Sequence, residues 1–166
     1  MFTTLDGFLQ GWGEISSNTR RVLDSLTDAA LAQPVAPEGR TLGQIAWHLV
    51  QTLGEMGAKA GLAVDAPAED APMPAAAAEI AAAYRTAAAS LVAELTAQWT
   101  DATLAETIPM YGEQWTRGKV LFVLLIHEVH HRGQLTVLMR QAALRVPGVC
   151  GPAREDWAQW GLPAAP

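Results

Sequence analysis

The chain has 166 residues, half of them hydrophobic, and carries 11 Lys and Arg against 17 Asp and Glu, for a net charge of −6. This length suits one domain with a proper core and is too short for two. The acidic balance, with no run of Lys or Arg, argues against nucleic acid and anionic membranes as partners. We therefore expect a single domain over residues 1–166.

Three features predict a cytoplasmic protein. Cys150 is the sole cysteine, so no intrachain disulfide can form and nothing indicates an oxidising compartment. The N-terminal residues have neither the basic start nor the continuous apolar stretch of a signal peptide. The longest apolar run, residues 120–126, is far shorter than the ~20 residues that a membrane span needs.

The composition favours an all-α fold, because Ala is abundant and no alternation of β-branched and aromatic residues indicates a strand. The first predicted helix covers residues 3–26, with Thr3 or Thr4 as its cap. The two glycines that flank Trp12 each weaken this helix by about 1 kcal/mol relative to Ala, which predicts a close neighbour or a kink. A connection with room for one short helical turn follows.

Thr41 begins the second predicted helix, and Gln44 completes a capping box with it. The core stripe of this helix runs from Leu42 to Met56, and His48 lies at the edge of the stripe. A lone histidine on a helix is more often structural than a metal ligand. His48 therefore becomes a candidate ligand only if another helix supplies partners.

The middle of the chain, residues 61–115, indicates structural elements and few candidates for a functional site. Residues 61–74 are rich in Pro and Ala, as in an exposed and mobile connection. An Ala-rich third helix is predicted over residues 75–98, where small side chains permit a neighbouring helix to approach closely. Residues 100–115 then form a link in which Tyr111 and Glu113 are weak candidates for the rim of a site, although surface turn chemistry is the simpler explanation.

The fourth predicted helix, residues 116–144, carries three histidines in its apolar middle. His127 and His131 are one turn apart, so both rings can lean toward one point about 2 Å from a nitrogen of each, as zinc requires. His130 can substitute for one of them or lie on the flank. Core histidines satisfied by hydrogen bonds are the simpler reading. A pair at this spacing nevertheless favours metal, and His48 from a facing helix completes an open three-nitrogen site.

The same residues spell H-E-x-x-H, which places Glu128 where a zinc protease keeps its general base. The pattern is short, and chance matches are common. A protease also needs a third ligand downstream and a substrate-binding strand, and the only plausible ligand there is Glu155. The sequence thus leaves an HExxH zinc protease as a minor alternative.

The C-terminal tail carries Trp157 and Trp160 three residues apart on a short predicted helix. Two tryptophans are costly to leave exposed, so the tail either folds back over the bundle or packs on a second subunit. Together with Trp12 and Trp99 they exceed what one small bundle easily buries. We therefore expect a homodimer.

Two segments, T-L-G-Q-I-A-W-H-L ending after His48 and H-E-V-H-H-R-G-Q from His127, resemble the DinB/YfiT-like superfamily, which is unrelated to the DNA polymerase of the same name. The resemblance covers nearly the whole chain and implies a four-helix bundle with a non-sequential helix arrangement, often dimeric. It implies a divalent ion, zinc or nickel, held by His48, His127 and His131, with His130 outside. Some relatives are transferases or isomerases that use low-molecular-weight thiols, and many have no known reaction.

Two functions remain open. In the enzyme hypothesis, the ion lowers the pKa of a bound water or thiol toward about 7 so that it attacks a small electrophilic substrate, and Glu128 or Glu55 carries the proton. In the competing hypothesis, the ion only pins the second and fourth helices together. No thiol cofactor pocket is recognisable in the sequence. The residues expected to orient the ligand rings or to lie near them are Gln44, Gln51, Glu55, Arg132 and Gln134.

Overall fold

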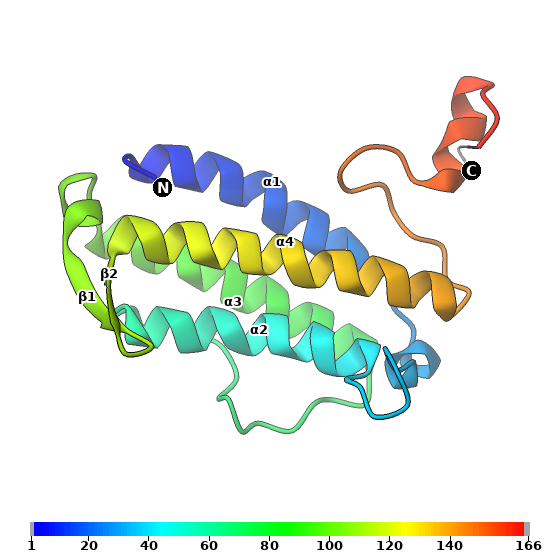
Figure 1. Cartoon of the computed structure of the whole chain (residues 1–166), viewed down its shortest axis with the longest axis horizontal. Helices are drawn as coiled ribbons and strands as arrows, with labels where there is room; N and C mark the ends of the chain where they lie inside the picture. The colour runs from blue at the N-terminus through cyan, green and yellow to red at the C-terminus, as the bar shows by residue number, and fades with distance from the viewer. Residues whose placement is uncertain (1, 165–166) are drawn as a thin grey trace.

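Four long helices lie side by side in the computed structural model, which describes residues 2–164 (Figure 1). The expected four-helix bundle is confirmed, while Met1, Ala165 and Pro166 of the predicted domain lie outside the described residues. The helices are α1 (Leu5–Asp24), α2 (Leu42–Lys59), α3 (Ala77–Gln98) and α4 (Arg117–Gln141).

Threonine side chains fix three of the four helix starts. Thr4 Oγ1 accepts a hydrogen bond from the backbone N–H of Gly7 at 3.2 Å. Thr41 and Gln44 form the predicted capping box, in which each side-chain oxygen accepts from the other residue's N–H, at 3.2 and 2.8 Å. Thr116 caps α4 as Thr4 caps α1. Each such cap stabilises a helix by ~1 kcal/mol, so local sequence sets these boundaries.

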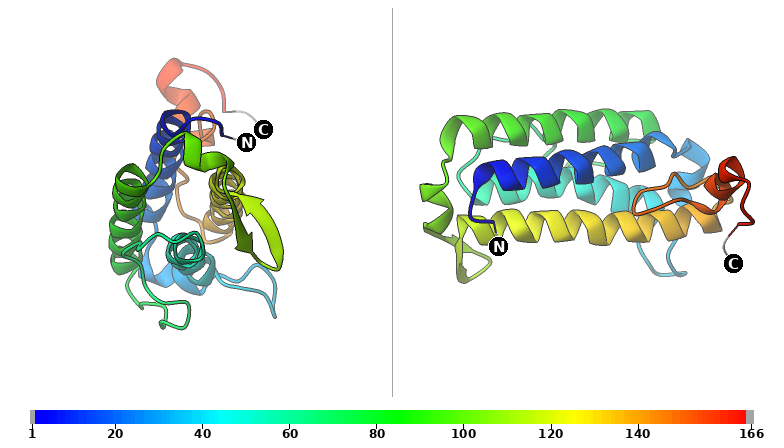
Figure 2. Two further views of the ribbon diagram at one scale, coloured as in Figure 1. Left: turned by 90° about the vertical axis from the view of Figure 1, so that its left-hand side faces the viewer. Right: turned by 90° about the horizontal axis from the view of Figure 1, so that it is seen from above.

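The helices are not arranged in chain order. Helix α1 packs on α3 and α4, and α2 also packs on α3 and α4. The end-on view shows the resulting ring, α1–α3–α2–α4, in which the chain crosses the bundle between α1 and α2 and again between α3 and α4 (Figure 2). Two seams therefore lie on opposite sides of the bundle, one between α2 and α4 and one between α1 and α3.

The core buries two of the tryptophans that supported the predicted homodimer. Trp12 is 1% exposed and Trp99 is 4% exposed within a single chain, so neither needs a second subunit. Trp157 is partly buried and Trp160 is 55% exposed. Only the tail tryptophans therefore still support the predicted homodimer. None of the helices within residues 2–164 combines the length and apolarity needed to cross a membrane.

A hairpin precedes α4, where the sequence indicated no strand. Strands β1 (Thr107–Met110) and β2 (Glu113–Thr116) pair antiparallel. The turn residues Tyr111 and Gly112 both have positive φ, 52° and 81°, as a two-residue hairpin turn of type I′ requires. Strands of four residues, one of them containing Pro109, are too short for an alternating pattern to reveal. The expectation that the chain contains no strand was therefore wrong for this link.

The connection between α2 and α3 is fastened to α2 at several points, although eight of the fourteen residues in the predicted exposed segment 61–74 are indeed exposed. The Gln51 side-chain amide donates to three carbonyl oxygens between residues 68 and 71, at 2.9 to 3.2 Å. The connection also crosses two glycines of α2 closely, because a Cβ at Gly54 or Gly57 would lie 2.8 or 2.6 Å from its side chains. Its path is thus defined by contacts with α2.

The C-terminal tail is tied to α1 and α4 and then extends past the end of the bundle (Figure 1). The Asn18 side chain donates to the Val149 carbonyl at 2.9 Å, and the Arg140 guanidinium pairs with the Glu155 carboxylate. Short 3₁₀ helices occupy the tail and two connections: η1 (Asp28–Ala32), η2 (Ala102–Ala105) and η3 (Arg154–Trp160).

Candidate metal centre

Three histidine rings meet at the seam between α2 and α4. His127 Nε2 lies 3.3 Å from His48 Nε2 and 3.1 Å from His131 Nε2. One nitrogen from each ring lies within 4.8 Å of the other two. The structure thus brings together the three histidines that the sequence and the resemblance assign to a metal site.

The spacing of these nitrogens suits a single divalent ion. Two nitrogens that bind one tetrahedral ion at 2.0–2.1 Å stand about 3.3 Å apart, close to the 3.1 and 3.3 Å measured between the ring nitrogens. Imidazole is a common ligand of both zinc and nickel. Three protein nitrogens leave a fourth position for water or substrate.

Two features suit the rings to metal binding. His131 Nδ1 lies 2.7 Å from Gln134 Oε1, and a hydrogen bond donated by Nδ1 to this oxygen leaves Nε2 with a lone pair for a metal. Gln134 thus lies where a residue that orients the His131 ring is expected. Burial, and then the charges of neighbouring histidines, lower the pKa of all three rings, that of His127 to about 4. The rings are therefore neutral at pH 7.

A polar pocket of about 150 Å³ opens beside His48. Gln51, Thr52 and Glu55 line it from α2, and Glu69 lines it from the connection between α2 and α3. The Thr52 hydroxyl donates to the His48 carbonyl at 2.8 Å, which leaves the carboxylates as the charged groups of the pocket. Glu55, predicted as a proton carrier, therefore lies next to a candidate ligand.

The hairpin tip reaches this pocket. The Tyr111 hydroxyl donates to Glu55 Oε2 at 2.7 Å, and Lys59 Nζ lies 3.1 Å from Glu55 Oε1. Burial and the bond to Glu55 raise the pKa of Tyr111, so its phenol stays protonated and remains a donor. Tyr111 is thus found at the rim, as the sequence suggested, whereas Glu113 pairs instead with Lys119 and Trp115.

Glu128 does not line the pocket. It is 1% exposed, and it accepts a short hydrogen bond from the Tyr84 hydroxyl of α3. Burial raises the pKa of Glu128 to about 7, against the opposing effects of Tyr84, Thr19 and Arg132. Adjacent helical residues point about 100° apart, so Glu128 faces the core while His127 faces α2. Its position supports neither the predicted proton carrier nor the general base of an HExxH protease.

The other candidates have separate tasks. His130 is exposed, with its ring packed against His131 at a centroid distance of 4.9 Å. Gln44 closes the cap of α2, and Arg132 donates to the Ile15 carbonyl of α1 at 2.8 Å. Glu155, the downstream ligand that a protease needs, pairs with Arg140.

Sequence reasoning missed two charged residues near the site. Glu69 enters the pocket only because the connection crosses α2, and no local pattern predicts that path. Arg40 immediately precedes the cap of α2, and its positive charge contributes to lowering the pKa of all three histidines. Its position just before the helix that carries His48 is a signal that could have placed it near the site.

Residues 1–162 match the DinB family. The chain belongs to the DinB family. A crystal structure of a DinB-like protein from Bacillus cereus ATCC 10987 superimposes with a TM-score of 0.87 at 41% identity, covering 90% of this DinB chain and 99% of the other. A DinB-like protein of Bacillus subtilis, YjoA, superimposes with a TM-score of 0.68 at 17% identity, over 87% of this chain and 99% of its own, and shows a shared fold.

One curated relative extends the similarity over the full length. YrdA of Bacillus subtilis (strain 168), an uncharacterized protein, is 48% identical over 164 residues, which cover 99% of this DinB chain and 98% of YrdA. The resemblance inferred from the two histidine segments is therefore confirmed. Family membership fixes the fold and leaves the reaction to be argued from the site.

Proposed function

We propose that this DinB protein is a metal-dependent enzyme that acts on a small molecule at the three-histidine site, as a thiol-dependent transferase or isomerase or as a hydrolase. The observation that supports this most strongly is the convergence of three neutral imidazole nitrogens, 3.1 and 3.3 Å apart, beside a polar pocket. Zinc or nickel is the proposed ion, because both accept imidazole ligands.

A bound divalent ion supplies Lewis acidity, which lowers the pKa of a bound water or thiol toward about 7. His48, His127 and His131 hold the ion, and Gln134 keeps the His131 ring in the binding tautomer. Glu55 is the proposed proton carrier, because its carboxylate lines the pocket and Tyr111 fixes one of its oxygens. A low-molecular-weight thiol is the proposed nucleophile for the transferase form.

A purely structural metal site is the competing function. A structural ion needs a fourth protein ligand or a dry apolar surround. Within residues 2–164 the group contains three histidines and no fourth His, Cys, Asp or Glu. The adjoining pocket carries two carboxylates, those of Glu55 and Glu69. Both observations support catalysis over a structural role.

The test combines metal analysis with turnover. Purified protein is analysed for zinc and nickel and then screened with low-molecular-weight thiols against small electrophiles, and with hydrolase substrates. Glu55→Gln should keep the metal and lower kcat by about 100-fold or more, as expected for a lost proton carrier. Glu79→Gln, an exposed glutamate in the first turn of α3, is the matched control and should keep full activity. One ion per chain with no turnover on any substrate would favour the structural bundle.

We also propose that the protein is a cytoplasmic homodimer. The remaining support for the dimer is the tail, where Trp160 is 55% exposed beside Trp157 at a centroid distance of 6.1 Å. A reducing compartment agrees with the single exposed Cys150. Sedimentation at tens of micromolar should show a dimer that dissociates when the chain is shortened to end at Pro147. A monomer with either chain length would refute the dimer.

A further inference from the structure

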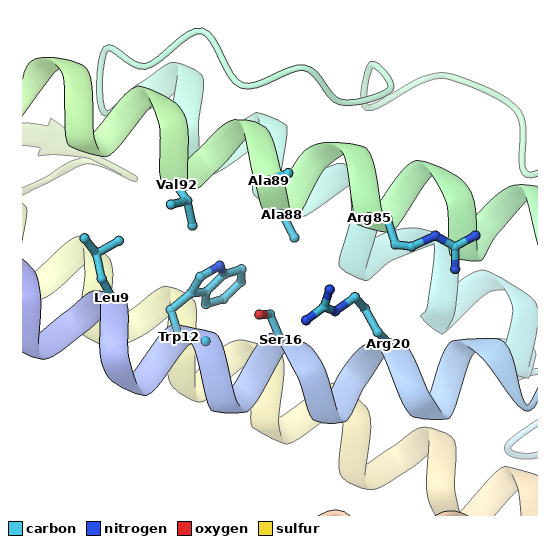
Figure 3. A pocket seen from close by; sticks show the side chains of 9 residues that line it. Leu9, Trp12, Ser16, Arg20, Arg85, Ala88, Ala89 and Val92 are labelled. Carbon is cyan, nitrogen blue, oxygen red and sulfur yellow. The ribbon is translucent and has the colours of Figure 1, made fainter.

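A second pocket lies on the side of the bundle opposite the histidine seam. It is a half-open groove of about 380 Å³ between α1 and α3 (Figure 3). This volume falls within the range of small-molecule sites, roughly 300–1,000 Å³. The groove exists because the residues facing each other across its middle are small: Gly13, Ala88 and Ala89.

The groove changes character along its length. Leu9 of α1 and Val92 of α3 form one end, and Arg20 and Arg85 face each other at the other end (Figure 3). Arg85 is held by Asp24 at 2.6 Å. Arg20 forms no ion pair with any residue among 2–164, so its charge is available to a ligand. An apolar end and a cationic end together suit an amphipathic anion.

Two residues with hydrogen-bond donors, Trp12 and Ser16, lie between these ends. Trp12 is 1% exposed and Ser16 is 6% exposed, and Figure 3 shows both side chains in the groove between α1 and α3. Neither the Trp12 indole N–H nor the Ser16 hydroxyl makes a hydrogen bond to a residue that the structure describes. Neither atom is among the fully buried polar atoms without a partner, so both reach the solvent in the groove, where a ligand could accept from them.

We propose that this groove binds a small carboxylic acid with an aliphatic chain. The chain lies between Leu9 and Val92, and the carboxylate accepts from Ser16 and faces Arg20. Trp12, Ser16 and Arg20 stand four residues apart on one stripe of α1, which places Arg20 about 12 Å from Trp12 along the helix. A carboxylate supplies an acceptor for the Ser16 hydroxyl and a negative charge for Arg20. The site is separate from the histidine seam and does not depend on the proposed enzyme activity.

The test uses octanoate as the probe, titrated into the full-length metal-loaded protein by calorimetry. Gly13→Leu should weaken binding at least 10-fold, because its side chain would enter the groove and a Cβ there meets no atom within 4 Å. Ala89→Leu blocks the groove from α3 and gives a second variant if the first fails to fold. Gly133→Leu, another helical glycine with open space at its Cβ, is the control and should leave binding unchanged.

The charge is tested separately. Arg20→Gln should weaken octanoate binding about three- to five-fold at low salt, the size expected of an exposed charge pair, and should leave binding of neutral octanamide unchanged. Absence of octanoate binding would overturn the proposal. So would binding that survives both groove-filling variants but disappears in His48→Ala, since the carboxylate would then be at the metal. A change of sedimentation in Gly13→Leu without any octanoate binding would make the groove an interface between two copies, which also overturns it.

Discussion

Two faces of α4 place neighbouring polar residues in different surroundings. His127 and His131 face α2, where their nitrogens converge with that of His48, which also lines a polar pocket. Glu128 and Arg132, one residue further along in each case, face α1 and α3 and are each 1% exposed. Both pairs have a spacing of four residues, which keeps the two members of a pair on one face of the helix. Adjacent residues point about 100° apart, so the two pairs lie on different faces.

The difference lies in how each face satisfies its polar groups. In the core, Glu128 accepts from Tyr84, and Arg132 donates to the Ile15 carbonyl at 2.8 Å and to the Thr19 hydroxyl at 3.4 Å. Those donors and acceptors are complementary, so the face is complete without a ligand. At the histidine face, ring nitrogens of three histidines lie close together, and this group could hold a metal ion.

The largest expected effect is on the histidine face. His48→Ala, His127→Ala and His131→Ala should each lose the bound metal, because two nitrogens cannot hold an ion as firmly as three. Elemental analysis of the purified variants measures the loss. His130→Ala is the matched control on the same helix and should retain metal. Loss of metal in the His130 variant alone would refute the ligand assignment.

The core face should respond in stability and not in metal content. Arg132→Met removes the donor to the Ile15 carbonyl and the Thr19 hydroxyl, together with the positive charge near Glu128, and should lower the free energy of unfolding by about 3 kcal/mol. Urea denaturation measures this change, and elemental analysis should show metal retained. Arg145→Met, which breaks an exposed pair with Asp156, is the control and should cost less than about 1 kcal/mol. A loss of metal in Arg132→Met would mean that the two faces are coupled.

The two faces should also differ in the sign of their pH dependence in metal-free protein. The pKa of Glu128 is raised to about 7, so the folded state holds its proton more tightly, and its contribution to stability is lost as pH rises from 4.5 to 7. The histidine pKa values are lowered, so their contribution is lost as pH falls from 6.5 toward 4.

Glu128→Gln removes the first effect. Relative to wild type, it should gain on the order of 3 kcal/mol between pH 4.5 and 8, measured by urea denaturation. Glu155→Gln is the control, because Arg140 holds the pKa of Glu155 at about 2 and its carboxylate stays ionised over this range. An offset between Glu128→Gln and wild type that does not change with pH would contradict the buried protonated carboxyl.

Removing the metal should have the smallest effect of the four. An ion at 100 times its Kd adds about 2.7 kcal/mol to the folded state, so chelator at pH 7 should lower the Tm by roughly 5–10 °C. Metal affinity should fall as pH drops from 6.5 toward 4, a lower window than free histidine gives, because burial lowers the pKa of the rings. Chelator competition across this range measures the fall. A Tm that ignores chelator in metal-loaded protein would mean that the ion does not join α2 to α4.

Local signals in the sequence predicted the helices and the histidines. The capping threonines set helix starts to within a residue or two, and apolar spacing identified α1 to α4. The histidine pair was visible because a four-residue spacing brings two rings together on any helix. The same periodicity places Glu128 on another face of the helix. The H-E-x-x-H pattern suggested a catalytic role for this residue, whereas helix geometry separates it from the histidines.

The remainder depended on non-local contacts. The hairpin has only four residues per strand and is fixed by the backbone of Tyr111 and Gly112. Glu69 enters the pocket because Gln51 holds three carbonyls of a connection whose composition indicates only an exposed loop. Neither contact leaves a pattern within a short window of sequence.

The crossing order of the helices also sets the sequence of events in folding. His127 and His131 come together as soon as one turn of α4 forms, whereas His48 lies 79 residues before His127. Closing a loop of that length costs about 4 kcal/mol of chain entropy, so this contact forms only when α2 docks on α4. An ion present from the start of refolding meets two nitrogens first and gains the third late. The rate at which a spectroscopically visible ion such as nickel reaches three-nitrogen coordination should therefore report the docking of α2, separately from the formation of helix.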